Sequence, residues 1–429
     1  MPLPVNRTTG LVAIFFAALT LGSAPARSQN TGFVAPVQTP AEAMAFDAAA
    51  YAQAHQVSID QALHRLQAEL ESVATTDRLR AQYRDRLAGI SIEDEPEFRI
   101  AVLLTGQEPV AGQSIVAGGM RVPIVFRTGA RATRQQVIAA MWRHQGELAQ
   151  ALPDARGAGL DQRTGDLVLL LGAAAAARYD LVATQQQAEA LTGVPVQLRL
   201  VDGPDVNMAV AGGSRIDGIV PGDGKRYICT TGFVVTDGAK TGLASAAHCP
   251  DAVTVHDPDG GDVPLPFVGQ WGARYQDVQI NAAPDGLAPL FYADRHRAAL
   301  RPVTSWRNRA STRAGDTVCH WGEGSGYSCS EVELTDFAPP GALCGGQCEP
   351  VWMTVRGPSC HGGDSGGPVF LGTVALGIFK GGNRTSDGRC IFYYYMSTDF
   401  LPAGWSLLAE PPIAGAPAGG GSVASHPRK

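Results

Sequence analysis

The sequence changes character after about Asp202. Before it, residues 41–92 are rich in Ala, Leu, Gln and Glu with apolar residues three and four positions apart, which is typical of helices. Ser58 stands where a helix would begin. After it, short runs rich in Val, Ile and Thr alternate with Gly and Pro as far as about Trp405. Such runs, bounded by turn residues, predict an all-β sandwich or barrel.

A chain of 429 residues is too long for one ordinary core, so we expect two folded units. In the first unit, segments of strand and helix character alternate after residue 92, which predicts a small α+β arrangement. The expected elements are a strand over 98–106, a strand over 122–129, a helix over 133–152, a strand over 165–173, a helix over 183–193 and a strand over 194–201. The net charge of −6 gives no basic surface, so we expect no nucleic-acid partner.

The N-terminal end of the chain predicts export. Arg7 precedes an apolar run from Leu11 to about Leu21, and a small-residue cleavage site ends at Ala26, which together indicate a signal peptide over residues 1–26. A membrane anchor is the alternative, but the run is shorter than the roughly 20 residues that a span needs. We therefore expect a secreted protein, extracellular or periplasmic, without membrane contact after signal removal. Residues 409–429 are of low complexity and predict a disordered tail.

The eight cysteines all lie between Cys229 and Cys390. An even number of cysteines in an exported chain indicates disulfides. A zinc site would want C-x2-C pairs, whereas the one close pair here, Cys344 and Cys348, has three residues between its members in a Gly-rich loop. We therefore expect disulfides, and neither a metal nor another cofactor.

Three short segments of the β unit carry the side chains of an activated nucleophile. "LASAAHCP" contains His248, "YQDVQI" contains Asp277 and "CHGGDSGGP" contains Ser365. A serine hydroxyl is a poor nucleophile near neutral pH, so it needs a base within hydrogen-bond reach and a carboxylate that orients the base. The nearby acids Asp257, Asp259, Asp262 and Asp285 are alternatives to Asp277, but the first three resemble turn residues and only Asp277 lies in a segment with strand alternation.

The glycines around Ser365 indicate where the negative charge of a tetrahedral intermediate would be stabilised. Backbone N–H groups can converge on one oxygen only where side chains are absent, and glycine also permits unusual dihedral angles. We expect the N–H groups of Gly363 and Ser365 to form this oxyanion hole.

The stretch "GDSGG" also fits G-x-S-x-G, the nucleophile pattern of the α/β-hydrolases. In that fold the serine precedes the acid and the histidine, and it stands between a strand and a helix. Here the only histidine after Ser365 is His426, in the tail, and a strand is expected to follow the serine. The order histidine, acid, serine instead matches the chymotrypsin arrangement.

The segments "AAHC" and "GDSGGP", in this order, resemble the chymotrypsin-type serine peptidases. The hairpin "VCHWGEGSGYSCSEV" and the segment "ALGIFKGGN" resemble the bacterial secreted branch, α-lytic protease and the streptogrisins. This likeness covers about residues 209–405. More weakly, "YAQAHQVSIDQALHRLQ" and "GAGLDQRTGDLVLLL" resemble the pro-regions that assist the folding of these enzymes.

The resemblance implies a peptidase domain over residues 209–408, built from two six-stranded antiparallel β-barrels with the triad between them, and an α+β pro-region over residues 27–208. The bond cleaved to release the mature enzyme would lie near "NMAVAGGSRI". The resemblance also implies the disulfides Cys229–Cys249, Cys319–Cys329 and Cys360–Cys390, with Cys344–Cys348 as an additional local bridge.

The resemblance further implies how an extended peptide substrate is bound. Gly381 and Gly382 would pair with its backbone. Phe379 would line the primary pocket, with His361 at its rim and Ser359 on its wall.

The chain departs from the family pattern at two positions. Asp364 must be buried and needs a partner, and the bacterial branch supplies an arginine where this chain has His320. We hypothesise that His320 pairs with Asp364, with Arg313 as the alternative partner. The second departure is Lys380, where serine is usual; its side chain would bind Asp277, or turn toward the cleft and favour acidic substrates.

We therefore predict a secreted serine endopeptidase that is made as a precursor and acts on extended peptides or proteins, with its own pro-region as a second partner. The competing hypothesis is a catalytically silent binding protein with a protease fold, because Lys380 could compete with His248 for the carboxylate of Asp277.

Overall fold

The computed structural model describes residues 36–201, 205–207, 213–220, 224–257, 261–283, 287–294 and 299–410. The expected signal peptide, residues 208–212 of the expected cleavage segment and most of the tail lie outside these residues. Within the described part of the chain, no helix is both long enough and apolar enough to span a membrane.

The described chain begins with two helices, α1 (Pro40–His55) and α2 (Ile59–Gln82). Both helices begin with a capping box. The side chains of Thr39 and Ser58 accept from the backbone N–H groups of Glu42 and Gln61. In return, the side chains of Glu42 and Gln61 accept from the backbone N–H groups of Thr39 and Ser58. The predicted start at Ser58 is therefore confirmed. The predicted helical region extends too far, however, because residues 87–92 belong to a strand whose side chains are almost all buried.

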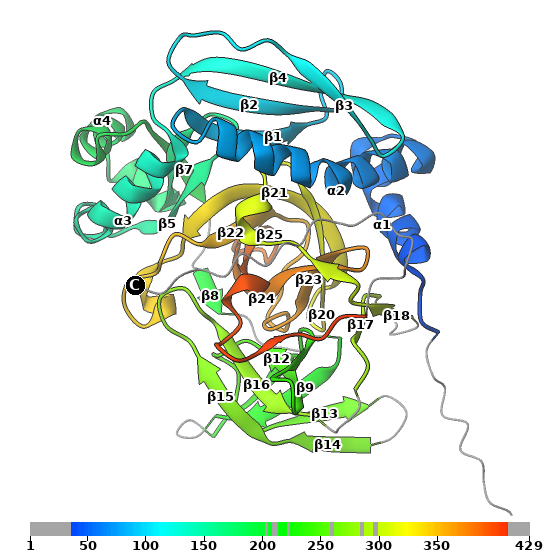
Figure 1. Ribbon diagram of the computed structural model, residues 1–429. Coiled ribbons are helices and arrows are strands. Elements are labelled where there is room, and N and C mark those ends of the chain that lie inside the picture. The colour runs from blue at the N-terminus through cyan, green and yellow to red at the C-terminus, as the bar shows by residue number, and fades with distance from the viewer. Residues whose placement is uncertain are drawn as a thin grey trace, which may run out of the picture. The chain divides into compact units, whose positions relative to one another are not determined.

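A mixed four-stranded sheet packs next to α2, in the order β1 (Leu87–Glu93), β2 (Arg99–Thr105), β4 (Met120–Ala130) and β3 (Gln113–Ala117). Figure 1 shows α2 lying across this sheet. The alternating segments that follow are α3 (Arg134–Ala151), β5 (Ala155–Asp161), β6 (Asp166–Gly172), α4 (Leu181–Thr192) and β7 (Val196–Val201). Each helix and strand expected between residues 98 and 201 is confirmed to within two residues at either end, whereas β3 and β5 were not expected.

Six strands in the C-terminal half form a closed antiparallel barrel, because the last strand of the series, β21, also pairs with the first, β20. In order around the barrel they are β20 (Thr317–Gly322), β23 (Pro368–Leu371), β24 (Val374–Arg384), β25 (Cys390–Ser397), β22 (Trp352–Arg356) and β21 (Gly326–Ala338). The barrel strands carry large buried side chains, and Phe379 and Tyr395 belong to the same hydrophobic cluster.

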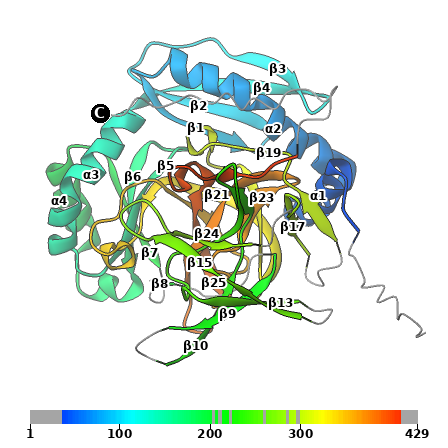
Figure 2. The same cartoon turned by 60° about the horizontal axis from the view of Figure 1, so that its bottom comes forward.

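Two further sheets lie below this barrel in Figure 1, and Figure 2 brings them forward. One sheet is β10 (Arg226–Thr230), β9 (Arg215–Ile219), β13 (Val253–Asp257) and β14 (Gly261–Leu265). The other sheet is β15 (Phe267–Trp271), β16 (Val278–Ala282), β12 (Thr241–Ser245), β11 (Val234–Thr236) and β26 (Ser406–Leu407). The remaining short strands are β8 (Asp205–Asn207), β17 (Leu290–Tyr292), β18 (Leu300–Pro302) and β19 (Ser305–Trp306).

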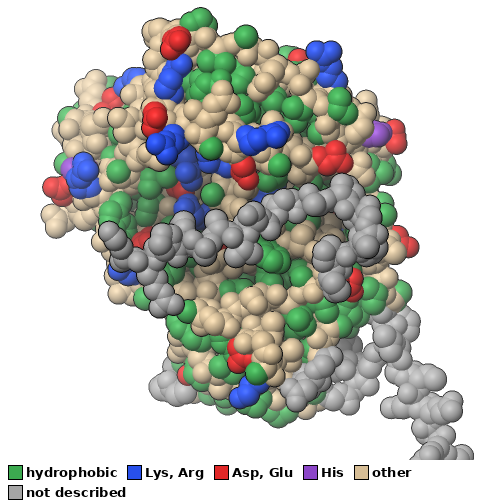
Figure 3. Space-filling view, in the orientation of Figure 1, with side chains coloured by type: hydrophobic (Ala, Val, Ile, Leu, Met, Phe, Trp, Pro, Cys, Tyr) green, Lys and Arg blue, Asp and Glu red, His purple; other side chains and the backbone are tan. Residues whose placement is uncertain are grey.

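The N-terminal half is joined to the barrel by backbone hydrogen bonds. Strand β5 pairs antiparallel with β21, so β5, β6 and β7 extend the barrel sheet beyond the barrel itself. Two buried acidic residues of the helices also bond to the C-terminal half: Asp47 of α1 binds Arg301, and Glu69 of α2 accepts from the backbone N–H of Thr317. On the visible face of the molecule, acidic and basic side chains are interspersed (Figure 3).

Candidate active site

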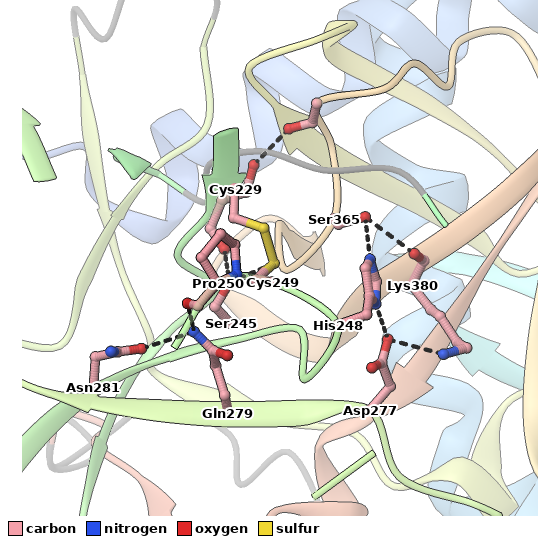
Figure 4. The surroundings of a disulfide bond; sticks show 12 residues. Cys229, Ser245, His248, Cys249, Pro250, Asp277, Gln279, Asn281, Ser365 and Lys380 are labelled. Atoms are coloured by element: carbon pink, nitrogen blue, oxygen red, sulfur yellow. Dashed lines mark hydrogen bonds and ion pairs between the residues drawn. A yellow bond between two sulfur atoms is a disulfide. The ribbon is translucent and has the colours of Figure 1, made fainter. Parts of the chain in front are cut away.

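His248, Asp277 and Ser365 meet in one line. Nε2 of His248 lies 2.8 Å from Oγ of Ser365, and Nδ1 of the same ring lies 2.8 Å from Oδ2 of Asp277 (Figure 4). His248 follows β12, Asp277 immediately precedes β16, and Ser365 lies three residues before β23. Because β12 and β16 pair directly, their ends hold the histidine and the acid together, while the barrel supplies the serine.

The acid and the base of the site are largely buried. The side chain of Asp277 is 2% exposed and that of His248 is 17% exposed. Burial by itself would raise the pKa of Asp277, but the imidazole of His248 and the ammonium of Lys380 outweigh burial and hold that pKa well below its usual range. The carboxylate is therefore ionised and can accept from Nδ1–H of His248, which leaves Nε2 free to take the hydroxyl proton of Ser365.

Lys380 contacts both ends of this line. Its Nζ lies 3.1 Å from Oδ2 of Asp277, and its backbone oxygen accepts from Oγ of Ser365 at 3.2 Å (Figure 4). Its side chain is 2% exposed and its ammonium lies 5.2 Å from the ring centre of Trp352. Of the two orientations that the sequence allowed, the side chain adopts the one toward Asp277.

Glycine is required in the backbone around Ser365. Gly363 has φ of 134° and Gly366 has φ of 87°, and a Cβ on Gly366 would lie 2.2 Å from the backbone oxygen of Thr230. Thr230 holds this loop through two bonds, because its N–H donates to the oxygen of Ser365 and its hydroxyl donates to the oxygen of Gly363, both at 2.9 Å. These contacts fix the two residues whose N–H groups are the expected oxyanion donors.

The buried partner of Asp364 differs from the one that we hypothesised. The carboxylate of Asp364 accepts from the N–H and the hydroxyl of Ser325, at 2.9 and 2.7 Å, and from the N–H of His361 at 2.7 Å. Ser325 and His361, rather than His320 or Arg313, are therefore its hydrogen-bond partners among the described residues. Arg313 bonds instead to Asp316.

His320 occupies a different environment from the one expected. Its Nε2 lies 3.1 Å from the backbone oxygen of Ser359, and its ring packs against Phe379 and Tyr393. Burial lowers the pKa of His320, and the charge of Asp364 opposes this effect without overcoming it. A neutral imidazole needs only one donor contact, which Ser359 accepts.

The structure contains four disulfides, which are the same pairs that the resemblance implies: Cys229–Cys249, Cys319–Cys329, Cys344–Cys348 and Cys360–Cys390. The first ties the residue that follows His248 to β10, and the last ties the segment before Ser365 to the start of β25. Both bridges hold loops of the triad on the sheets.

The residues expected to bind substrate lie on or near β24. Gly381 and Gly382 pair with Asn207 and Val206 of β8, so this edge of the strand accepts an extended segment. Phe379 is fully buried and stacks on Tyr393 at 4.9 Å. His361 is exposed, and Ser359 is half-buried with its backbone oxygen bound to His320.

Sequence reasoning missed Thr230, Ser325 and Met396, all of which contact the residues of the site. Met396 accepts from the N–H of Asp277 through its sulfur at 3.3 Å. Their side chains act on residues distant in the sequence, so no local pattern marks them. For Ser325 the signal was present, because it lies in the Gly-rich hairpin that the resemblance singled out.

Comparison with known proteins gives sequence relatives among the bacterial proteases. No family model matches the chain. Serine protease 1 of Streptomyces fradiae is 29% identical over 386 residues, which are 87% of this chain and 90% of that protein. Glutamyl endopeptidase 2 of Streptomyces griseus is 26% identical over 174 residues, which are 39% of this chain and 85% of that protein.

Solved structures give weaker likenesses. Thermobifida fusca protease A is 22% identical and covers 47% of this chain and 100% of its own, with a TM-score of 0.37. A glutamic-acid-specific serine protease described as using a histidine triad in substrate binding is 23% identical, with a TM-score of 0.35, and covers 44% of this chain and 94% of its own.

Proposed function

Since the chain is a relative of the bacterial secreted serine proteases of the chymotrypsin class, we propose that it is a serine endopeptidase made as a precursor. The observation that carries the proposal is the unbroken line from Ser365 through His248 to Asp277, with both hydrogen bonds at 2.8 Å. This geometry is what nucleophilic attack by a serine requires, because the base is already within reach of the proton that it must remove.

The reaction would run in two halves. Oγ of Ser365 attacks the carbonyl carbon of the peptide bond while Nε2 of His248 takes the hydroxyl proton, and the imidazolium then gives this proton to the leaving amine. Asp277 stabilises the imidazolium and holds its orientation. Water, deprotonated by His248, releases the acyl group from the serine in the second half.

The negative oxygen of each tetrahedral intermediate would be bound by the N–H groups of Gly363 and Ser365. A lost donor of this kind costs roughly 3–4 kcal/mol of transition-state stabilisation. The substrate would lie as an extended strand along Gly381 and Gly382, with Phe379 at the primary pocket, Ser359 on the wall and His361 at the rim.

Residues 27–208 would be the pro-region of this precursor. In support, β8 ends at Asn207, the first residue of the expected cleavage segment, and already pairs as an extended strand with Gly381 and Gly382. We expect secreted material to lack residues up to the segment "NMAVAGGSRI", and a Ser365→Ala chain to keep them. Intact-mass measurement of both proteins tests this, and a fully active wild-type chain of uncleaved length would contradict maturation.

Two finer expectations belong to the same proposal. The sheets β10-β9-β13-β14 and β15-β16-β12-β11-β26 would together form the second barrel, facing the closed one across the triad. The signal peptide over residues 1–26 would direct the chain to the periplasm or the medium, and the four disulfides are consistent with an oxidising compartment.

A catalytically silent binding protein is the second candidate, and the observation that favours it is Lys380, which shares an oxygen of Asp277 with His248. A fluorophosphonate probe separates the two functions, because only an activated serine reacts with it. We expect stoichiometric labelling of the wild-type chain, none of Ser365→Ala, and full labelling of the matched control Ser330→Ala, whose serine lies on β21. A folded wild-type chain that stays unlabelled would contradict the peptidase and support the binding protein.

A further inference from the structure

Lys380 is a buried cation for which the reaction described above has no role. Its side chain is only 2% exposed, and a buried ammonium is costly unless it is paired. The structure supplies two compensating contacts, the carboxylate of Asp277 at 3.1 Å and the face of Trp352 at 5.2 Å. A lysine that only filled the core could end in water, as lysines usually do, instead of on the carboxylate of a triad.

The two contacts of Lys380 with the triad act on different atoms. Its ammonium binds Oδ2 of Asp277, the same oxygen that His248 uses, while its backbone oxygen accepts from the hydroxyl of Ser365. One residue of β24 therefore restrains both the carboxylate and the nucleophile. The ammonium also places a positive charge close to the imidazole, across a single shared oxygen atom.

We propose that Lys380 is a positioning residue of the triad, whose ammonium holds the carboxylate of Asp277 in its orientation toward His248 and whose charge disfavours the uptake of a further proton by the triad. The physical reason is that a buried positive charge 3.1 Å from Oδ2 of Asp277 disfavours the addition of another proton to the triad, so activity should persist to lower pH with Lys380 than without it. This inference rests on the proposed function.

Among the described residues, Lys380 is the lysine or arginine paired with the carboxylate of Asp277. The charged groups with the largest effect on Asp277 are His248 and Lys380 themselves. Strand β22 presents the uncharged ring of Trp352, and β25 presents the thioether of Met396. Asp364, next to the nucleophile, has its carboxylate bound to Ser325 and to the N–H of His361.

The test measures kcat and KM between pH 4 and pH 9 for the wild-type chain and for Lys380→Met, Lys380→Ser and Lys380→Arg, using one peptide substrate. For the two neutral variants we expect the acid limb of kcat/KM to move to higher pH by about one unit or more. We also expect a lower plateau of kcat and a KM changed by less than about twofold. Lys380→Arg keeps the charge, so the acid limb of its kcat/KM profile should lie at the same pH as that of the wild-type chain.

Three outcomes would overturn the inference. The first is an acid limb that is the same in Lys380→Met, Lys380→Ser and the wild-type chain, which would leave Lys380 a merely structural residue. The second is an acid limb that moves equally in Lys380→Arg, which would assign the effect to shape instead of charge. The third is that neither neutral variant folds while Lys380→Arg does, which would show that the positive charge is needed for folding instead of for catalysis.

The wild-type chain separates this inference from the proposed function. A wild-type chain that neither cleaves peptides nor reacts with the fluorophosphonate probe would refute the endopeptidase itself. An active wild-type chain whose acid limb does not respond to Lys380 would refute only the role of the lysine.

Discussion

Replacing Asp47 with alanine is expected to destabilise the precursor strongly, because Asp47 is the buried anion that joins α1 to the C-terminal half. Its side chain is 0% exposed and that of its partner Arg301 is 1% exposed. Oδ1 and Oδ2 lie 2.9 and 3.0 Å from Nη1 of Arg301, and the carboxylate also accepts from the hydroxyl of Tyr327 and the N–H of Gly372, both at 2.6 Å.

The magnitude follows from what the substitution leaves behind. Asp47→Ala keeps the guanidinium of Arg301 buried but removes its counter-charge, and breaking a buried pair from one side costs about 3–5 kcal/mol. The double variant Asp47→Leu/Arg301→Met removes both charges and should recover much of this loss, because replacing a buried pair with apolar residues is often close to neutral.

The assay is urea unfolding followed by tryptophan fluorescence, in the Ser365→Ala background so that no self-cleavage occurs. For Asp47→Ala we expect the unfolding midpoint to fall by roughly 1–2 M urea. Asp85→Ala is the matched control, because its side chain is 88% exposed, and it should change the free energy of unfolding by less than about 0.5 kcal/mol. A loss for Asp47→Ala no larger than that of the control would show that this buried ion pair does not stabilise the precursor.

Two more predictions concern stability in the same Ser365→Ala background. Burial, followed by the charge of Asp316, raises the pKa of Glu69 to about 8 from an ordinary value of 4.5. Between these two pH values the folded chain keeps a proton that the unfolded chain has released. The free energy of unfolding should therefore fall as pH rises from about 4.5 toward 8. Glu69→Gln cannot release this proton, so its free energy of unfolding should fall less between pH 5 and pH 8, and a fall equal to that of the parent chain would contradict the assignment. Gly366→Ala should cost roughly 3–5 kcal/mol in urea unfolding, because the new Cβ meets the oxygen of Thr230 at 2.2 Å in a left-handed conformation. Gly193→Ala is also left-handed, but among the described residues its new Cβ meets open space apart from its chain neighbours, so it should cost only about 1–2 kcal/mol. Equal losses at the two positions would show that crowding around Ser365 is not decisive.

The parts of the structure that the sequence could predict are those that local patterns encode. The capping of α2 by Ser58 and the elements between residues 98 and 201 follow from composition and period over a few residues. His248 and Ser365 were identifiable because each lies in a short motif whose chemistry requires its neighbours. Residues 87–92 were misassigned because their burial in a sheet overrides the helical character of the residues before them.

The remaining features depend on contacts between residues far apart in the chain. Asp47 and Arg301 are separated by 254 residues, and no periodicity links them. The bond between Asp364 and Ser325 depends on how a hairpin folds over the loop of the nucleophile, so the position of His320, where the bacterial branch has an arginine, was a misleading guide. Likewise, the pairing of β5 with β21 could not be read from either strand alone.

The most direct test of the central claim is a single-turnover experiment with an activated ester, stopped by acid and followed by peptide mapping. We expect one acyl group per chain, attached to Ser365. We also expect the rate of acylation to fall sharply in His248→Ala, because Nε2 of His248 is the only base placed 2.8 Å from the hydroxyl within the described residues. Ester turnover with the acyl group on another residue, or acylation of Ser365 that is equally fast without His248, would contradict these expectations.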